Sequence, residues 1–203
     1  MIVVSIIIPH FNHSALLKET IQSVKQQTFK DWEIIIVDDG SSENEFAAIK
    51  KYENGQNITV VQRANGIKGP SRCRNIGADL ATGKYLIFLD SDDLLAPFCL
   101  QQRVAVMAEA PQPGLGVFRQ YTFEGETPDT KTFFSKDIHT REEAKNYFLQ
   151  MDAPWQTMAS IWKKKTFTLL VGFDESLECM EDPDLHLRAL FNTDKIVCFY
   201  LYE

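Results

Sequence analysis

The stretch KYLIFLDSDDLLAP, residues 84–97, places a buried run directly before a cluster of charge. Its first part, YLIFL at residues 85–89, is entirely apolar or aromatic and is typical of a strand with both faces covered. Asp90, Asp92 and Asp93 follow at once, although three carboxylates in four positions repel one another. The stretch therefore predicts a strand that carries acidic side chains to a fixed place, where water or a cation meets them.

The composition indicates a globular protein with a sizeable core. The chain has 203 residues, 44% of them hydrophobic, and a net charge of −7. The negative charge argues against a nucleic-acid partner, because such proteins usually present a basic face. The four cysteines form no CxxC pair, which makes a zinc site improbable and favours a reduced, cytoplasmic setting.

The chain shows no sign of export or membrane insertion. The N-terminal MIVVSIIIPHFN lacks a basic n-region, and its apolar run ends at Pro9, so it predicts a strand rather than a signal peptide. No apolar stretch approaches the roughly 20 residues that cross a bilayer.

Strands and helices alternate through the first hundred residues. Apolar, β-branched runs predict strands at 3–8, 33–37, 58–62 and 85–89. The segments between and after them predict helices at 15–28, 43–52, 71–81 and 94–109. This order predicts an α/β fold with a mostly parallel central sheet and helices on both faces.

The second half is less regular, and PQPGLG at 111–116 interrupts the pattern. We expect strands at 117–124, 157–162 and 195–201, helices at 140–150, 163–170 and 182–191, and an exposed loop at 125–139. The helix at 140–150 opens on the capping box Thr140-Arg-Glu-Glu143. No linker or repeat is visible, so we expect a single domain over residues 1–203.

Polar clusters follow three of the predicted strands. Pro9-His-Phe-Asn follows the first, Asp38-Asp39-Gly-Ser-Ser the second, and Asp90-Ser-Asp-Asp the fourth. Ligands of open parallel sheets bind outside the carboxyl ends of the strands. The three clusters should therefore meet in one crevice.

The DSDD cluster suits a hard divalent cation, because carboxylate oxygens bind Mg²⁺ or Mn²⁺ and leave positions for phosphate oxygens. We favour Asp92 as the metal ligand, with Asp90 assisting. The alternative is helix capping, in which Asp92 or Asp93 caps the helix expected from residue 94. One acid is enough for a cap, so Asp93 either caps that helix or reaches the ion.

The second cluster, VDDGSS at 37–42, predicts an Asx-type turn that uses one of Asp38 and Asp39 together with Ser41 or Ser42. The other carboxylate could accept a hydrogen bond from a nucleobase imide N–H.

A third segment, NGIKGPSRCRNIGADLATG at 65–83, suits a diphosphate. It places Lys68, Arg72 and Arg74 near a helix N-terminus, whose dipole also favours anions. The segment contains neither a Walker A loop nor GxGxxG. The alternatives are a solvated basic helix end, or structural pairing of Arg74 with an aspartate of another cluster.

A fourth segment, GFDESLECMEDPDLHLRA at 172–189, places Glu181-Asp182 before a helix. Asp182 is a natural N-cap, and it could instead act as general base on a hydroxyl nucleophile. His186 is interpreted as a helix-face residue rather than a metal ligand.

Together, SIIIPHFN, VDDGSS, GPSRCRNIGADLATGKYLIFLDSDD and GFDES…EDPDL resemble the motifs of family 2 glycosyltransferases in order and spacing, over about residues 5–191. The resemblance implies a GT-A fold, with 1–110 as the nucleotide-sugar half and 111–203 as the acceptor-side half. It also implies inverting transfer from a nucleotide-diphosphate sugar, with a UDP-sugar expected, to a hydroxyl, assisted by Mn²⁺ or Mg²⁺.

The resemblance assigns donor-side roles residue by residue. Phe11 lies against the base ring, Asp39 accepts from the base N–H, and Asp90 and Asp92 form a DxD pair on ribose and the cation. The nucleotide-sugar-binding residues that it implies are Pro9, Phe11, Asp38, Asp39, Lys68, Arg72, Arg74, Asp90 and Ser91.

On the acceptor side, the resemblance implies that Asp182 deprotonates the acceptor hydroxyl, with Glu181 as second candidate. The acceptor, a glycan or a lipid-linked molecule of surface polysaccharide synthesis, has no signature in the sequence. We expect a cytoplasmic location that is compatible with, but does not require, peripheral association with the inner face of a membrane.

Two alternatives differ in class. A sugar-1-phosphate nucleotidyltransferase usually has a Gly-rich loop after its first strand, and Pro9-His-Phe-Asn-His has no glycine. A nucleotide-sugar-binding domain without turnover is the other. Family members often carry basic or aromatic residues beyond the last predicted helix, whereas this sequence stops at Glu203 and suggests a shortened C-terminal part.

Overall fold

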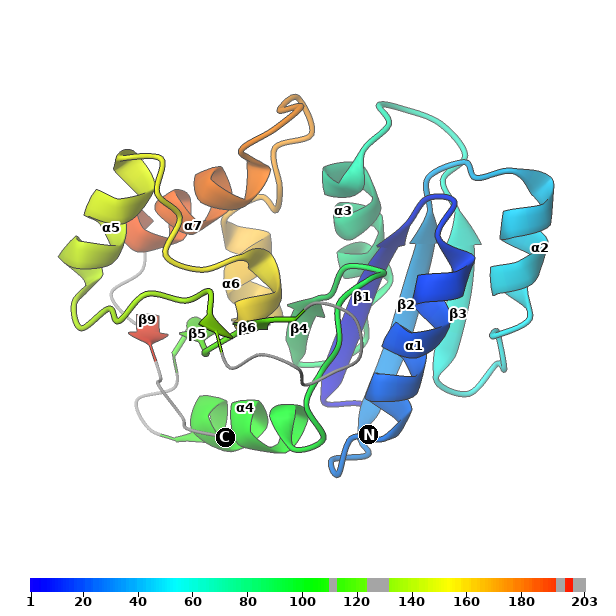
Figure 1. The fold of residues 1–203 in the computed structure, drawn as a ribbon, viewed down its shortest axis with the longest axis horizontal. Coiled ribbons are helices and arrows are strands. Elements are labelled where there is room, and N and C mark those ends of the chain that lie inside the picture. The colour runs from blue at the N-terminus through cyan, green and yellow to red at the C-terminus, as the bar shows by residue number, and fades with distance from the viewer. Residues whose placement is uncertain (110–112, 124–131, 193–195, 199–203) are drawn as a thin grey trace.

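A central sheet runs through the computed structural model, which describes residues 1–109, 113–123, 132–192 and 196–198 (Figure 1). Seven strands pair in the order β3-β2-β1-β4-β8-β5-β9. Their bounds are β1 Val4–His10, β2 Trp32–Asp38, β3 Ile58–Gln62, β4 Tyr85–Phe88, β5 Leu115–Val117, β8 Ser160–Lys163 and β9 Ile196–Cys198. Two short strands, β6 Tyr121–Thr122 and β7 Thr132–Phe133, pair separately.

The sheet is mostly parallel, as predicted. Strand β1 pairs parallel with both β2 and β4, β2 with β3, and β5 with β9. Only β8 runs antiparallel to its neighbours β4 and β5 within the described sheet. The strand expected at 85–89 is β4, the fourth of seven, and so lies in the middle of the sheet.

Helices cover both faces of the sheet, which confirms the predicted layers. The helices are α1 Ser14–Lys25, α2 Glu43–Lys50, α3 Pro70–Leu80, α4 Cys99–Ala108, α5 Arg141–Leu149, α6 Lys164–Leu169 and α7 Glu181–Asn192. Side chains from α1, α2 and α4 join one core cluster, and those from α3, α5, α6 and α7 join the other.

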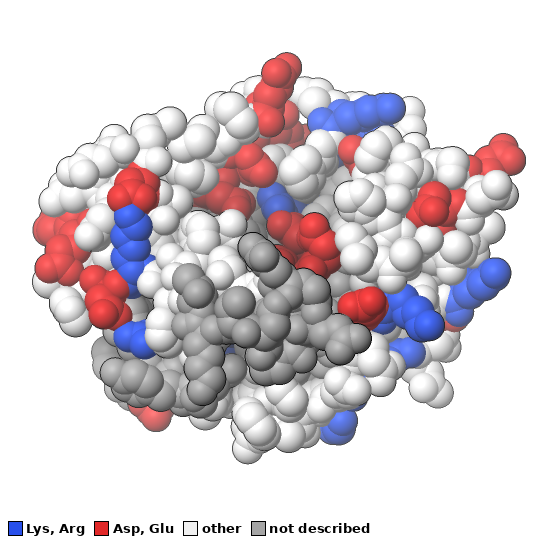
Figure 2. Space-filling model, viewed as in Figure 1, with Lys and Arg blue, Asp and Glu red and all other residues white. Residues whose placement is uncertain are grey.

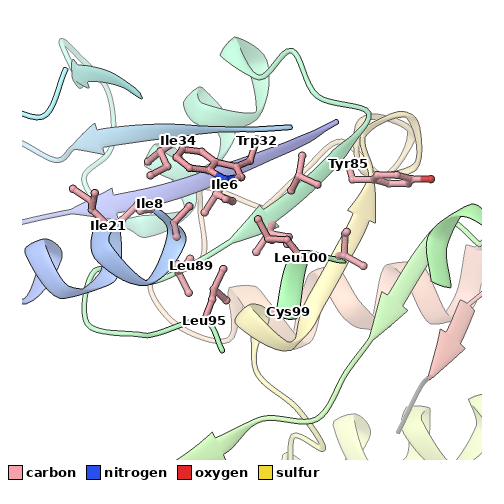
Figure 3. Close-up of a cluster of buried hydrophobic side chains, with 14 of the residues drawn as sticks. Ile6, Ile8, Ile21, Trp32, Ile34, Tyr85, Leu89, Leu95, Cys99 and Leu100 are labelled. Carbon is pink, nitrogen blue, oxygen red and sulfur yellow. The ribbon is translucent and has the colours of Figure 1, made fainter. Parts of the chain in front are cut away.

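The two clusters arise from the alternation of side chains along the strands. Ile6 and Ile8 of β1 point into the first cluster, whereas Ile7 between them points into the second. Figure 3 shows the first cluster, to which Ile21 of α1, Leu100 of α4 and the isoleucines Ile6 and Ile8 of β1 belong. The continuous apolar runs of the sequence therefore reflect strands that are buried on both sides.

Helix α4 begins later than expected. The prediction placed its start at residue 94, but the helix starts at Cys99 with Phe98 as N-cap. The residue before a proline disfavours the helical conformation, and Pro97 lies in this segment. The Gln27 amide holds the segment in its non-helical path, donating to Leu95 and Ala96 carbonyls at 3.3 and 2.7 Å.

The second half departs from prediction in three places. The strand expected at 117–124 is two short strands, β5 and β6, and the one expected at 157–162 begins as a 3-10 turn, Thr157–Ala159, before β8. The prediction of an exposed loop at 125–139 is wrong in two respects: the segment contains strand β7, and Ile138 is buried in the second core cluster. Residues 124–131, and the end of the strand expected at 195–201, lie outside the described residues.

The predicted capping box is confirmed. The capping box at α5 is present, since Glu143 N donates to Thr140 Oγ1 at 3.1 Å and Thr140 N donates to a Glu143 carboxylate oxygen at 3.2 Å. In the part of the chain that the structure describes, each helix is too short or too polar to traverse a bilayer.

Helix α3 packs closely on β1 at Gly77, and a Cβ added there would overlap Ile7 Cγ2. We expect Gly77→Ala to lower the free energy of unfolding by about 1–2 kcal/mol, because overpacking outweighs the gain of up to about 1 kcal/mol in helix propensity. Urea denaturation measures this. Asp79→Ala, at an exposed position of the same helix, is the control, and an increased midpoint for Gly77→Ala would contradict the packing.

Candidate active site

The predicted polar clusters lie at one edge of the sheet. Because β1, β2 and β4 are adjacent and parallel, their carboxyl ends face the same way, and His10 of β1 pairs in register with Asp38 of β2. Asp90 follows soon after the end of β4. Figure 2 shows acidic side chains gathered around a hollow in the middle of this face of the molecule.

Asp38 has a structural role at this edge. Its buried carboxylate accepts hydrogen bonds from Ser41 Oγ at 2.5 Å, from Gln62 Nε2 at 3.0 Å and from the backbone of Gly40 and Ser41, and it lies 2.9 Å from His10 Nδ1. Burial acts to raise the pKa of Asp38, but the hydrogen bonds outweigh it and hold the pKa below its usual value. This is the Asx-type turn expected from VDDGSS.

Asp39 holds a different segment. Its Oδ1 lies 2.5 Å from Arg63 Nε, and its Oδ2 accepts from the backbone N–H of Gly69 at 2.9 Å. The carboxylate therefore fixes the loop that leads into α3. Sequence reasoning missed Arg63, although the strand order offers a signal, since Gln62 pairs with Asp38 and places Arg63 beside Asp39.

The remaining donor-side candidates line the same edge at different depths. Phe11, just after β1, is 49% exposed and presents a ring to solvent, while Pro9 is half-buried in the strand. Lys68 is exposed in the loop before α3. Arg72 lies half-buried, and its Nη1 donates to Glu175 at 3.0 Å, which ties α3 to the loop before α7.

Arg74 joins two of the acidic clusters. It is 4% exposed, and its Nη2 donates to Asp90 Oδ1 at 2.8 Å. On the other side, Nη1 donates to Glu181 Oε1 at 3.2 Å and lies 3.6 Å from Asp182 Oδ1. The sequence left open whether Arg74 pairs with an aspartate of another cluster, and the structure shows that it does. The guanidinium thus brings together carboxylates that stand about ninety residues apart in sequence.

The DSDD residues have three different surroundings. Asp90 has a side chain that is 45% exposed, Asp92 is exposed, and Ser91 is buried with its carbonyl accepting from Thr20 Oγ1. Asp93 is half-buried, and burial, with the negative charges of Asp90 and Asp92, raises its pKa to about 7. Asp93 does not cap a helix, because α4 starts at Cys99, so that reading is wrong.

The carboxylates of this cluster suit a hard divalent cation. Burial is the main cause of the raised pKa of Asp93, and the negative charges of Asp90 and Asp92 add to it; a hard cation would offset those two charges. Asp90 and Asp92 are the carboxylates open to solvent. Among the described residues, no three His, Cys, Asp or Glu side chains converge as a preformed metal site. A bound ion would therefore take its other ligands from phosphate oxygens and water.

Asp182 lies within the first turn of α7, which begins at Glu181, so it is not the N-cap. Burial raises the pKa of its carboxyl, and the Arg74 charge opposes that rise. Asp182 Oδ1 lies beside Arg74 Nη1, and hydrogen bonding from Thr157 acts with the Arg74 charge to lower the pKa of Asp182. The Asp182 side chain is still 25% exposed, so its carboxylate can meet a bound hydroxyl and accept its proton. Sequence reasoning did not find Thr157.

The sequence profile of glycosyl transferase family 2 matches residues 5–166. The chain belongs to this family. The matched region contains Asp39, Arg74 and Asp90 and stops before α7. The roles of all these residues, and of Asp182, stay predictions.

Relatives share the family. The chain is 33% identical over 140 residues to the GalNAc(5)-diNAcBac-PP-undecaprenol beta-1,3-glucosyltransferase of Campylobacter jejuni, covering 68% of this chain and 44% of that protein. It is 26% identical over 204 residues to the Staphylococcus aureus poly(ribitol-phosphate) beta-N-acetylglucosaminyltransferase TarS, covering 95% of this chain and 33% of TarS. The chain thus spans less than half the length of these two relatives.

Solved structures share the fold. S. aureus TarS superposes with a TM-score of 0.80 at 22% identity, over 99% of this chain and 36% of that one. A mannosyltransferase from Pyrobaculum calidifontis, solved with GDP-Man and Mn²⁺, gives a TM-score of 0.68 at 17% identity, over 97% of this chain and 54% of that one. The chain has the GT-A fold implied by its motifs.

The Asp38 network should make stability depend on pH. Its folded pKa is lowered, so the charged carboxylate stabilises the protein above its unfolded pKa, and this stabilisation is lost as the pH falls through the folded value. We expect Asp38→Asn to cost about 2–4 kcal/mol of unfolding free energy at pH 7 and much less at pH 3.

Denaturation of both proteins at the two pH values measures the effect. Asp31→Asn is the control, because Asp31 is exposed at the opposite end of the sheet. An equal cost at pH 3 and pH 7 would mean that the charge of Asp38 contributes nothing to stability.

Proposed function

We propose that this chain is the catalytic domain of an inverting, metal-dependent glycosyltransferase that moves a sugar from a nucleotide-diphosphate sugar to a hydroxyl acceptor. The expected donor is a UDP-sugar. The observation that carries the proposal is the bridge made by Arg74, which holds Asp90 at the end of β4 and Asp182 of α7 at one site. Transfer needs two separate acidic groups, one for the leaving diphosphate and one for the attacking hydroxyl.

On the donor side, the base would lie against the exposed ring of Phe11, beside Pro9. Asp39 would accept the imide N–H of the base while keeping its bonds to Arg63 and Gly69, because a carboxylate has about four acceptor positions. Asp38 supports this position through its buried network rather than by touching the ligand.

Departure of the nucleoside diphosphate builds negative charge on its phosphates. A cation held by Asp92, with Asp90 shared between it and the ribose, would supply the charge that stabilises the leaving group. Lys68 and Arg72, at the N-terminal end of α3, add positive charge nearby, and the helix dipole has the same sign. Ser91, which lies between Asp90 and Asp92, would contact the donor through its backbone.

On the acceptor side, Asp182 would take the proton of the attacking hydroxyl. Its side chain is 25% exposed beside Arg74, and burial raises its pKa, which makes the carboxylate a stronger proton acceptor. Glu181, whose Oε1 accepts a hydrogen bond from Arg74 Nη1, is the second candidate.

We propose that the chain works as one domain, with residues 1–110 binding the donor and 111–203 facing the acceptor. The named activities of the relatives support a glycan or lipid-linked acceptor in surface polysaccharide synthesis. TarS structures solved with UDP and with UDP-GlcNAc support a uridine nucleotide donor. A location in the cytoplasm, at the inner face of a membrane, would bring the site to a lipid-linked acceptor.

Donor binding is tested by thermal denaturation with UDP and Mn²⁺. We expect UDP with Mn²⁺ to raise the melting temperature, because a ligand that binds only the folded state stabilises it. Asp92→Ala should abolish the shift, and Asp31→Asn should keep it. If no nucleoside diphosphate shifts the melting temperature of the wild-type protein, the donor site is wrong.

Catalysis is tested by release of UDP from UDP-sugars. We expect Asp182→Asn to lower the rate about 10²- to 10⁴-fold, the range typical for loss of a general base, while the UDP–Mn²⁺ shift remains. Glu181→Gln should have a smaller effect. A wild-type chain that binds UDP but releases none from any UDP-sugar would favour the alternative of a binding domain without turnover.

A further inference from the structure

His186 lies one turn after Asp182 in α7 and is fully buried. Its ring stacks on Phe148 at a centroid distance of 5.4 Å and meets Trp155 and Trp162, each at 5.5 Å. Burial lowers the pKa of His186 to about 4, so the imidazole is neutral at physiological pH. The sequence pattern placed this residue on a helix face, and the donor and acceptor roles proposed above do not use it.

The two ring nitrogens of His186 have different partners, and these fix the tautomer. Nδ1 lies 2.8 Å from the backbone carbonyl oxygen of Asp182, which can only accept, so Nδ1 carries the proton. Nε2 is then unprotonated and accepts from Ser160 Oγ at 2.9 Å. Ser160 is itself completely buried.

These bonds form a chain from the sheet to the residue proposed as base. The hydroxyl of Ser160 in β8 donates to His186, and His186 donates to the peptide of Asp182. The first turn of a helix lacks the full set of intrahelical hydrogen bonds and frays easily. Here the turn also follows Met180, which has a left-handed φ of 67° that non-glycine residues rarely adopt. An additional anchor at Asp182 therefore acts where the helix is weakest.

We propose that His186 is a positioning residue for Asp182: its neutral Nδ1–H tautomer ties the first turn of α7 to Ser160 of the sheet and so fixes where the Asp182 carboxylate meets the acceptor hydroxyl. This inference rests on the proposed function for the role of Asp182. An apolar ring of the same size would fill the same space between the aromatic side chains, so packing alone does not require a histidine.

The test compares turnover and donor binding in variants of His186. His186→Phe keeps the ring volume and removes both hydrogen bonds, whereas His186→Asn keeps a donor near the position of Nδ1. We expect His186→Phe to lower kcat for UDP release by about 10- to 100-fold, since small misplacement of a reacting group costs up to about 10²-fold. KM for the donor and the UDP–Mn²⁺ thermal shift should stay within about twofold, and His186→Asn should recover most of kcat.

A double variant separates positioning from folding. His186→Phe leaves Ser160 Oγ without its acceptor, so the double variant His186→Phe, Ser160→Ala removes that cost and should fold if the single variant does not. Its kcat should remain low. Wild-type kcat in the folded double variant, or equal kcat in the Phe and Asn variants, would overturn the inference.

The tautomer is measured independently by ¹⁵N NMR of the wild-type imidazole at pH 7. We expect a protonated Nδ1 and a bare Nε2, and the opposite tautomer or a charged ring would overturn the inference. This readout does not need turnover. If the wild-type chain releases no UDP from any UDP-sugar, the proposed function fails, and the link from Ser160 to Asp182 is decided by the tautomer alone.

Discussion

The buried charge of Arg74 is the constraint on which the site depends. A guanidinium that is 4% exposed would be costly to bury alone, and it is stabilised by carboxylates from two separate segments, at Asp90 and at Glu181 with Asp182. Removing one partner of such a pair leaves the other buried and uncompensated. The acids at the end of β4 and at the start of α7 are therefore not independent groups that happen to lie close, because one cation sets the position of both.

This arrangement also explains how the acids can differ in behaviour while sharing a cation. Asp90 keeps a side chain open to solvent, Asp93 is held toward its neutral form by burial and its neighbours, and Asp182 is half-buried beside Arg74. In the proposed function, environment rather than residue type would separate a cation ligand from a proton acceptor. Asp38 shows the opposite case, since many hydrogen bonds keep it charged and confine it to structural work.

Much of the fold could be predicted from the sequence, because β1, β2 and β4 are continuous apolar runs whose signal is local. The location of Asp39 and Asp90 at the carboxyl ends of strands could also be predicted, because the sequence itself shows where each apolar run ends. The helix start at Cys99 could not be predicted, because it depends on the Gln27 amide about seventy residues away. Arg63, Thr157 and the partners of His186 were missed for the same reason: each acquires its role only through tertiary contact.

Because β8 runs antiparallel to β4, the residues that reach the edge where β4 ends come before β8 in the sequence. In the parallel strands, residues at the edge that we propose binds the ligand come after each apolar run. Strand β8 runs the other way beside β4, so the residues at that edge precede it, and Thr157 lies there, three residues before the strand begins. A search for functional residues that looks only downstream of each hydrophobic segment will overlook this position in every protein with the same strand polarity.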